Sequence, residues 1–395
     1  MESNRLRKVV SGTNKGVQKA KCKADYGLYI HVPFCKTRCI YCAFYSTTFT
    51  TIRDKYVDAV CKEIELRLPA SQQPVTIYFG GGTPSQLSIE QLKQIMDAIN
   101  LVKNREVEIT IECNPDDMTD EYAQGLADIG FNRVSLGVQS FNDNYLKFLN
   151  RRHNSKKVFK AIEQIRNAGI DNISIDLMYG LPNQTLEHWQ TDIDTAISLG
   201  VQHISCYCLT YEEDTPLYEK LMNGEVSEID DELALQMYNS LIDKLTSAGF
   251  EHYEISNFAL PCYRSQHNSS YWNGIPYIGI GAGAHSYDGK TRSWNICDAK
   301  QYIRTLSSDK KSPLKAISEG EILSEENLYN ELIMTRLRTS DGLVLEEIPS
   351  KYRKHFEANS SQYYKSGMLA KQNGICRITR KGLFISDSIL STLFI

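Results

Sequence analysis

LYIHVPFCKTRCIYCAFYS, residues 28–46, joins a run of apolar and β-branched residues to a short loop that carries three cysteines. The run predicts a buried strand, and Cys35, Cys39 and Cys42 follow at its carboxyl end. Cysteine thiolates are the standard ligands of 4Fe-4S clusters, so three local cysteines leave one iron without a protein ligand. An open iron can be chelated by the amino and carboxylate groups of a small molecule. We therefore predict an iron–sulfur cluster on this loop.

A structural zinc site is the alternative for the cysteine loop, with His31 as a fourth ligand. Zinc loops usually pair two cysteines, two to four residues apart, with a distant second pair. The sequence offers no second pair of that kind. The spacing also differs from the bacterial ferredoxin run, which supplies four cysteines. A cluster is therefore favoured over zinc.

Six β-branched runs alternate with helical patterns between residues 26 and 259. We predict strands at residues 26–34, 75–80, 106–113, 132–138, 172–180 and 201–210. After the first strand, Val57, Val60 and Ile64 recur at helical spacing, and after the second, Ser88 is the predicted N-cap of a helix. Parallel neighbours need crossover helices, so the alternation predicts a parallel sheet that curves into a barrel or a partial barrel.

Each predicted strand ends in polar or glycine-rich residues. They are the cysteine loop, Gly80-Gly81-Gly82-Thr83-Pro84, Glu112, Gln139, Asp176 and Thr210. In α/β barrels the active site gathers at the carboxyl ends of the strands, so these features converge on one mouth. Singly, Glu112 or Asp176 could equally be a buried, hydrogen-bonded carboxylate, and Gln139 could cap a helix. Jointly, their positions predict one functional site.

The pattern changes after residue 260. QHNSSYWNGIPYIGIGAGAHSY, residues 266–287, is rich in aromatic residues and glycine and predicts loops and short strands. A polar linker is predicted near residues 305–321, then a helix at 324–338 and a short hairpin near the end, as in a winged-helix-like module. We therefore divide the chain into a basic extension (1–25), a barrel (26–260), an aromatic region with a linker (261–310) and a C-terminal domain (311–395).

Composition and charge exclude several classes of protein. The 395 residues are 42% hydrophobic and 23% charged, with a net charge of −4 and no apolar run long enough to span a membrane. That charge offers no support for a nucleic-acid partner, and the first residues lack the apolar core of a secretory leader. Eleven cysteines without a regular framework indicate a reducing cytosol. Residues 1–25 are locally basic and are predicted to be disordered.

The cysteine segment resembles the signature of radical S-adenosylmethionine (SAM) proteins, in the branch of the oxygen-independent coproporphyrinogen III oxidases. The resemblance covers most of residues 26–395. It implies an α/β fold, a partial (β/α)6 barrel with a smaller C-terminal helical, winged-helix-like module. It also implies reductive cleavage of SAM to methionine and a 5′-deoxyadenosyl radical.

The resemblance further implies a set of SAM-binding residues. The positions that match the family's pattern are Tyr29, Tyr41, Gly81, Gly82, Thr83, Glu112, Gln139, Arg151 and Asp176, with Thr210 as a weaker match. The glycines form a turn where backbone can approach a ligand closely. Arg152 is adjacent to Arg151, so the choice of arginine is open by one position.

Two departures from the oxidases point to a sister group, the HemW-type haem chaperones. The oxidases carry a fourth cysteine two residues after the third, where this chain has Phe44, and a longer segment before the first strand. Chaperones of the group often carry Asp where Ala43 stands, which leaves the electrostatics of the loop open.

HNSSYW, residues 267–272, matches that group's HNxxYW segment, which is associated with haem binding. The match implies that His267, Tyr271 and Trp272 bind haem, since imidazole is a good axial ligand and aromatic rings provide flat apolar surface. On residue type alone, His267 could instead satisfy a local turn beside a packed aromatic pair. His252 and His285 are rival ligands, because both flank the same aromatic region.

The residues and the resemblance together predict a haem chaperone that carries a 4Fe-4S cluster and exchangeable SAM. It binds haem and hands it to an acceptor protein, which the sequence does not name. The alternative is an oxygen-independent coproporphyrinogen III oxidase, and a third possibility is a radical SAM enzyme with another substrate. We expect a cytoplasmic protein without a membrane span.

Overall fold

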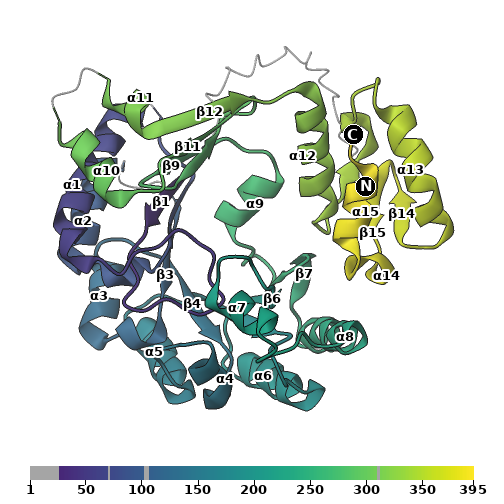
Figure 1. The fold of residues 1–395 in the computed structure, drawn as a ribbon, viewed down its shortest axis with the longest axis horizontal. Helices are drawn as coiled ribbons and strands as arrows, with labels where there is room; N and C mark the ends of the chain where they lie inside the picture. The colour runs from purple at the N-terminus through teal and green to yellow at the C-terminus, as the bar shows by residue number, and fades with distance from the viewer. Residues whose placement is uncertain (1–25, 70–71, 102–105, 309–311) are drawn as a thin grey trace, which may run out of the picture.

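The computed structural model describes residues 26–69, 72–101, 106–308 and 312–395. The basic extension predicted at residues 1–25 lies outside the described residues. The described chain forms one twelve-stranded sheet and one three-stranded sheet, each with its own hydrophobic core (Figure 1).

Six parallel strands form the centre of the large sheet, as predicted. They are β1 (Gly27–Val32), β2 (Thr76–Gly81), β3 (Glu108–Cys113), β4 (Arg133–Gln139), β5 (Asn172–Tyr179) and β6 (His203–Cys208). Each strand pairs in parallel with the next one in the sequence. Their side chains are mostly buried, as expected for a parallel sheet with helices on one face and polar residues at the rim. The parallel order brings the carboxyl ends of all six strands to one rim.

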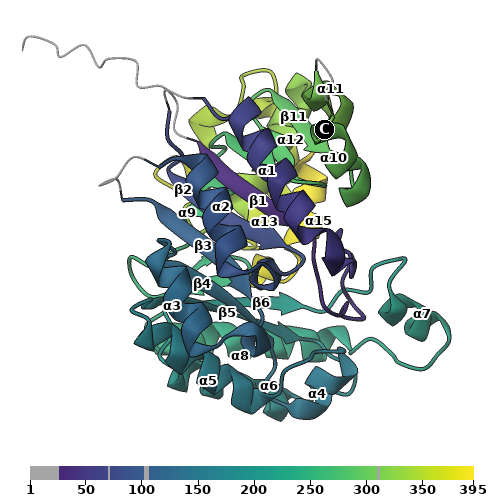
Figure 2. The same cartoon turned by 90° about the vertical axis from the view of Figure 1, so that its left-hand side faces the viewer.

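Crossover helices cover one face of the curved sheet (Figure 2). They are α1 (Arg53–Arg67), α2 (Ile89–Ile99), α3 (Asp120–Asp128), α4 (Asp143–Phe148), α5 (Ser155–Asn167) and α6 (Leu186–Ser198), with short 3-10 helices η1 (Thr50–Ile52), η2 (Pro84–Gln86) and η3 (Pro115–Asp117). Ser88 caps α2 as predicted, because its side chain accepts from the backbone N–H of Gln91 while the Gln91 side chain bonds back to Ser88 N.

Additional strands extend both edges of the sheet, which therefore stays open as a partial barrel. Beyond β6 lie β8 (Asn257–Ala259) and β7 (Glu251–Glu254), and beyond β1 lie β9 (Tyr277–Ile280), β10 (His285–Tyr287), β11 (Thr291–Asn295) and β12 (Ser318–Ile322). β9 pairs with β1 in parallel, and β10 to β12 continue as an antiparallel meander. The remaining helices of this part are α7 (Pro216–Met222), α8 (Asp231–Ser247), α10 (Ala299–Leu306) and α11 (Pro313–Ile317).

The aromatic segment differs from the prediction of loops and short strands. Residues 266–272 form a helix, α9 (Gln266–Trp272), and Ser265 caps it by accepting a hydrogen bond from Asn268 N. The strands predicted after it are present as β9 and β10. A seven-residue helix is too short to show a helical period in sequence, so only its cap could have marked it.

The predicted linker near residues 305–321 also contains regular structure. α11 and β12 lie there, and β12 pairs with β11 from Ser318 to Ile322. A strand with exposed side chains, as β12 has, carries no apolar alternation and is therefore mistaken for a linker. The boundaries proposed at residues 25, 260 and 310 stay predictions.

The C-terminal module has a core of its own, as predicted for a winged-helix-like fold. It contains α12 (Glu325–Leu337), β13 (Leu343–Val344), η4 (Leu345–Glu347), α13 (Arg353–Lys365), β14 (Leu369–Gln372), β15 (Ile375–Ile378), α14 (Arg380–Leu383) and α15 (Ser386–Leu393). The predicted hairpin is β14–β15, but two helices follow it. Figure 1 shows these elements grouped apart from α1 to α5. The module contacts the rest of the chain where α12 packs on α9. The Arg338 guanidinium pairs with the buried Glu254 carboxylate at 3.2 Å across that junction.

None of the helices in the described residues has the length and apolar composition needed to cross a membrane.

Candidate functional site

The three predicted cluster ligands lie on the loop that leaves β1, and none of them forms a disulfide. Cys35 is buried, and its sulfur lies 3.5 Å from Thr83 Oγ1. Cys39 Sγ accepts a hydrogen bond from Arg151 Nη1 at 3.3 Å. Burial raises the pKa of the Cys35 and Cys42 thiols, so in the absence of metal both stay protonated near neutral pH. A metal that binds them must displace these protons.

The zinc alternative requires His31 as a fourth ligand, and the structure engages that ring elsewhere. His31 Nδ1 lies 3.1 Å from the Tyr29 hydroxyl, and Nε2 lies 3.2 Å from the backbone oxygen of Tyr45. Across the described residues, no three His, Cys, Asp or Glu side chains converge on the position of a single metal ion. Ligands of a cubane cluster bind different irons and need no common point.

The glycine turn after β2 brings backbone into close contact with the cysteine strand. Gly81 has φ of +115°, and a Cβ there would lie 2.6 Å from the His31 ring. A Cβ on Gly82 would lie 2.8 Å from the Pro33 carbonyl carbon. Both positions therefore require glycine, as the turn predicted. Thr83 follows directly and places its hydroxyl against Cys35.

Glu112 is the penultimate residue of β3, and Asp176 lies in the middle of β5. Glu112 accepts hydrogen bonds from the Tyr78 hydroxyl at 2.8 Å and from Gly81 N at 3.2 Å. Burial raises the pKa of Glu112 to about 7, and the nearby Asp176 adds to the rise. Burial likewise raises the pKa of Asp176 to about 6. Two carboxyls with raised pKa values at one mouth are typical of a functional site.

The choice between the adjacent arginines follows from their contacts. Arg151 reaches Cys39, and its Nη2 donates to Asn114 Oδ1 at 2.7 Å. Arg152 instead pairs with Asp116 at 2.8 Å and Asp117 at 2.9 Å. Arg151 is therefore the arginine that lies beside the cysteines. Asn114, which the sequence analysis did not single out, contacts this arginine, and its position directly after β3 matches the strand-end rule.

The other predicted SAM residues lie within the strands or just after them. Gln139 is almost buried and has φ of +68°, at a bulge between β4 and β5. Tyr29 stacks on Tyr78 with 6.2 Å between ring centroids. Tyr41 is partly buried, packs on the small core around Leu149 and has its pKa raised by burial. Thr210, the weaker match, is exposed beyond the end of β6.

The predicted haem residues lie on α9, but their side chains point to different neighbours. His267 is 1% exposed, and its Nδ1 lies 2.8 Å from Thr76 Oγ1 while its Nε2 lies 2.8 Å from the Tyr271 hydroxyl. Both ring nitrogens are thus engaged. Burial lowers the pKa of His267 to about 3. The Arg338 guanidinium lies over the Trp272 ring, with its Cζ atom 5.5 Å from the ring centroid. His267 as a haem ligand stays a prediction that requires both hydrogen bonds to rearrange.

A cavity of about 710 Å³ lies beside the cysteine loop. Its lining combines loop residues with the aromatic region, and it consists of Tyr29, His31, Arg38, Ala43, Phe44, Tyr45, Ser46, Tyr271, Tyr277, Gly283, His285 and Cys297. The volume falls in the usual range for small-molecule and cofactor sites. Tyr29 is the one residue of the predicted SAM set in this lining, so the cavity adjoins that set rather than coinciding with it.

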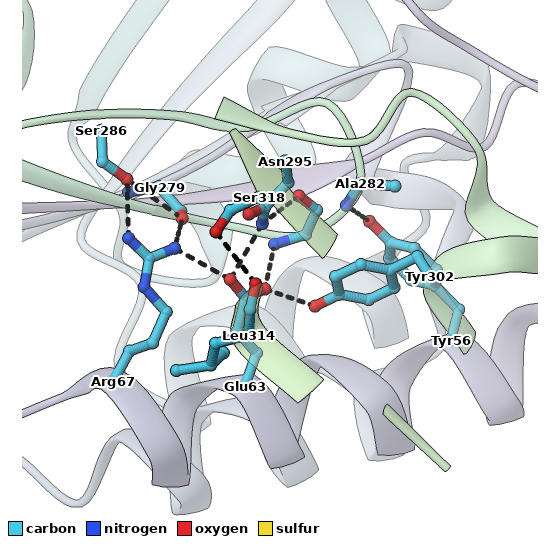
Figure 3. Close-up of polar contacts among 11 residues, drawn as sticks. Tyr56, Glu63, Arg67, Gly279, Ala282, Ser286, Asn295, Tyr302, Leu314 and Ser318 are labelled. Atoms are coloured by element: carbon cyan, nitrogen blue, oxygen red, sulfur yellow. Dashed lines mark hydrogen bonds and ion pairs between the residues drawn. The ribbon is translucent and has the colours of Figure 1, made fainter. Parts of the chain in front are cut away.

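A buried carboxylate fixes the aromatic region against α1, and the sequence analysis missed it (Figure 3). Glu63 is fully buried and accepts from Gly281 N at 2.9 Å, Asn295 Nδ2 at 2.8 Å and the Tyr302 hydroxyl at 2.5 Å. Arg67, one turn later, pairs with it at 2.8 Å. On an amphipathic helix Glu63 reads as a surface residue, and its partners lie more than two hundred residues away.

Two family models match the chain. Residues 29–196 match the Radical SAM superfamily, and residues 323–385 match the HemN C-terminal domain. Among solved structures, the chain is similar to the Escherichia coli protein described as "Coproporphyrinogen III oxidase (HemN) from Escherichia coli is a Radical SAM enzyme". That likeness has a TM-score of 0.79 and 23% identity, and it covers 94% of this chain and 90% of the other. The fold and the cysteine loop thus define a radical SAM protein.

Curated relatives that match along most of their length show which family of radical SAM proteins the chain belongs to. The chain is 36% identical to "Heme chaperone HemW" of Bacillus subtilis, over 91% of this chain and 97% of that protein. It is 32% identical to "Heme chaperone HemW" of Mycobacterium tuberculosis, over 93% of this chain and 94% of that protein. The chain therefore belongs to the HemW family of heme chaperones.

Radical SAM membership implies a 4Fe-4S cluster and SAM, and the residues at the mouth fit both. Three free thiols share one loop, and Arg151 Nε is buried without a hydrogen-bond partner among the described residues. A bound cluster would supply one-electron chemistry next to SAM. The chain's own residues would hold these groups through the cysteines, the glycine turn and the two carboxyls.

The raised pKa of Glu112 leads to a pH prediction. SAM carries positively charged groups, and such a group beside Glu112 favours the carboxylate, so binding should release a proton. SAM affinity is then expected to rise between about pH 6 and pH 7.5 and to level off above the free pKa of about 7. Isothermal titration across this range measures it. The Glu112→Gln variant should bind more weakly and lose the slope, whereas an unchanged slope in that variant would show that Glu112 is not the titrating group.

Proposed function

We propose that the chain binds haem and transfers it to an acceptor protein, with a cluster held by Cys35, Cys39 and Cys42 and with exchangeable SAM. The observation that carries the proposal is the cavity of about 710 Å³ beside the cysteine loop, because several aromatic side chains line it. Flat aromatic surfaces suit a macrocycle. The name "heme chaperone" carried by relatives that match along the whole chain supports the same ligand.

The site assignments belong to this proposal. SAM would lie among Tyr29, Tyr41, Gly81, Gly82, Thr83, Glu112, Gln139, Arg151 and Asp176. Of the three predicted haem residues, Tyr271 lines the cavity directly. Trp272 lines a second cavity of about 540 Å³, which Tyr271 also lines. We also propose that the protein acts in the cytosol, because the free cysteines indicate a reducing compartment.

The competing function is oxidation of coproporphyrinogen III, because the Escherichia coli oxidase shares the fold. The position of the oxidases' fourth cysteine is Phe44 here, and its side chain is 72% exposed at the mouth of the cavity. Phenylalanine can neither ligate iron nor transfer a proton. An exposed apolar ring instead offers surface to a ligand or a partner.

One experiment compares the two functions directly. Anaerobically reconstituted protein is expected to bind about one haem per chain, seen as a Soret band that saturates on titration. The same preparation, given SAM, a reductant and coproporphyrinogen III, is expected to form no protoporphyrinogen IX by chromatography. Robust product formation without haem binding would reverse the assignment. The Phe44→Cys variant is compared with the wild type in the same two assays. It introduces the oxidases' residue type at position 44 and leaves Cys35, Cys39 and Cys42 in place.

A further inference from the structure

The eight histidines differ in what their ring nitrogens contact, and all eight lie in the described residues. Both nitrogens are engaged in His31, His203, His267 and His355, and one is engaged in His153, His188 and His252. Neither nitrogen of His285 has a hydrogen-bond partner among the described residues. An imidazole with a free lone pair can ligate iron without breaking an existing bond. His153, His188 and His252 also keep one nitrogen free, but of these four histidines only His285 lines the cavity beside the cysteine loop.

His285 also occupies the right place for a ligand. It is exposed at the start of β10 and lines the cavity beside the cysteine loop, together with Tyr45, Tyr271 and Tyr277. Its ring lies 6.1 Å from the Trp294 ring on the paired strand β11. Aromatic side chains therefore surround a single unengaged imidazole on the wall of the cavity.

Hydrogen bonds in the network of Figure 3 fix the residues on both sides of His285. Ser286, the next residue, accepts from Arg67 Nη2 at 2.9 Å and from Gly279 N at 2.9 Å. The Tyr56 hydroxyl donates to the His31 backbone oxygen and accepts from Ala282 N, both at 2.9 Å. This ties the segment before His285 to the strand that bears the cysteines. A ligand on such a frame is pre-organised, because little freedom is lost when iron binds.

Resting on the proposed haem function, we propose that His285 is the axial ligand of haem iron and that haem lies in the cavity beside the cysteine loop. Arg38 lines the same cavity, and its guanidinium provides donors for a haem propionate. In this arrangement His267 is a positioning residue. It fixes the hydroxyl of Tyr271, whose ring lines the cavity, through the bond at 2.8 Å.

The surroundings of His285 support this role, since partial desolvation of the ring and the nearby Arg292 both lower its pKa. The imidazole is therefore neutral at physiological pH and offers its lone pair to the metal. Its exposure suits a cargo site, because an acceptor protein can reach a ligand that is not enclosed.

The test is a titration of the full-length reconstituted protein with ferric haem, followed by the Soret band and by EPR. His285→Ala is expected to weaken haem affinity about tenfold or more, which corresponds to about 1.4 kcal/mol, and to change the EPR signal of the axial ligand. Added imidazole should restore the wild-type spectrum in His285→Gly. His188→Ala is the matched control. His188 is also exposed, but its ring bonds to the Tyr145 hydroxyl and does not line the cavity. The variant should match wild type.

Each other outcome overturns a defined statement. If wild type binds no haem, the proposed function fails and the ligand assignment fails with it. If wild type binds haem and His285→Ala keeps both affinity and spectrum, the function stands and the His285 assignment is wrong. Loss of the axial signal in His267→Gln alone would return the role to His267. Loss of the axial signal in Cys297→Ser alone would assign the axial ligand to the exposed Cys297 thiol, which lines the same cavity.

Discussion

Replacement of Cys35, Cys39 or Cys42 by serine, one at a time, is expected to abolish the 4Fe-4S cluster. A hydroxyl is a far poorer ligand for iron than a thiolate, and each thiol of the loop is expected to hold a different iron. The wild-type protein, purified without oxygen, should contain about four irons and four sulfides per chain. Iron and sulfide analysis, with the visible absorption of the cluster, measures the loss.

The controls for this experiment are cysteines outside the loop of residues 35–42. Cys61 lies on the outer helix α1, and its sulfur contacts the Gln94 backbone oxygen at 3.6 Å, so Cys61→Ser should keep the full cluster content. Cys113, Cys206 and Cys208 should be dispensable as well. A cluster that survives loss of Cys39, or a stoichiometric zinc in its place, would contradict the assignment of the loop.

Replacement of Glu63 by alanine is expected to destabilise the fold by about 3–5 kcal/mol, the usual cost of breaking a buried ion pair. The change leaves the Tyr302 hydroxyl and Gly281 N without their acceptor and removes one of the two acceptors of Asn295 Nδ2. It also removes the counter-charge of Arg67, which keeps its bonds to Gly279 O and the Ser286 hydroxyl. Each of these donors was desolvated on folding and keeps that cost when its partner is removed. Urea denaturation followed by circular dichroism measures the change in the free energy of unfolding.

Glu65 on the same helix provides a matched control. Its side chain is 61% exposed and pairs with Lys62 at 3.1 Å on the surface. Glu65→Ala should therefore cost no more than about 0.5 kcal/mol. Glu63→Gln should fall between the two, because the amide keeps one acceptor oxygen. A loss below about 1 kcal/mol in Glu63→Ala would mean that the buried network contributes little to stability. Because this network anchors the segment before His285, Glu63→Ala should also weaken haem binding.

Local patterns account for the parts of the fold and site that could be predicted. Six β-branched runs with helical patterns between them specify parallel strands, because parallel pairing needs a crossover of helical length. The cysteine spacing and the Gly81–Gly82 turn are likewise local, since a few consecutive residues set them. Barrel topology predicts that strand ends meet at one rim. Glu112 lies next to the end of β3, whereas Asp176 lies three residues before the end of β5, and their role in binding SAM stays a prediction.

Elements without a local pattern were missed. The helix α9 is too short to display a period, and β12 has no apolar alternation. Arg151 could not be separated from Arg152, because the difference lies in their partners. One reaches Cys39 on the first loop, and the other pairs with Asp116 and Asp117 after the third strand.

By itself, the sequence determined that this chain is a radical SAM protein with a barrel, a cysteine loop and an aromatic segment rich in candidate haem residues. Only the tertiary structure decided which of those candidates is free to act. His267 and His285 look alike in sequence, yet one is buried between Thr76 and Tyr271 and the other is exposed on a cavity wall. The physical reason is that the availability of a lone pair depends on hydrogen-bond partners from distant strands, and residue type does not encode them.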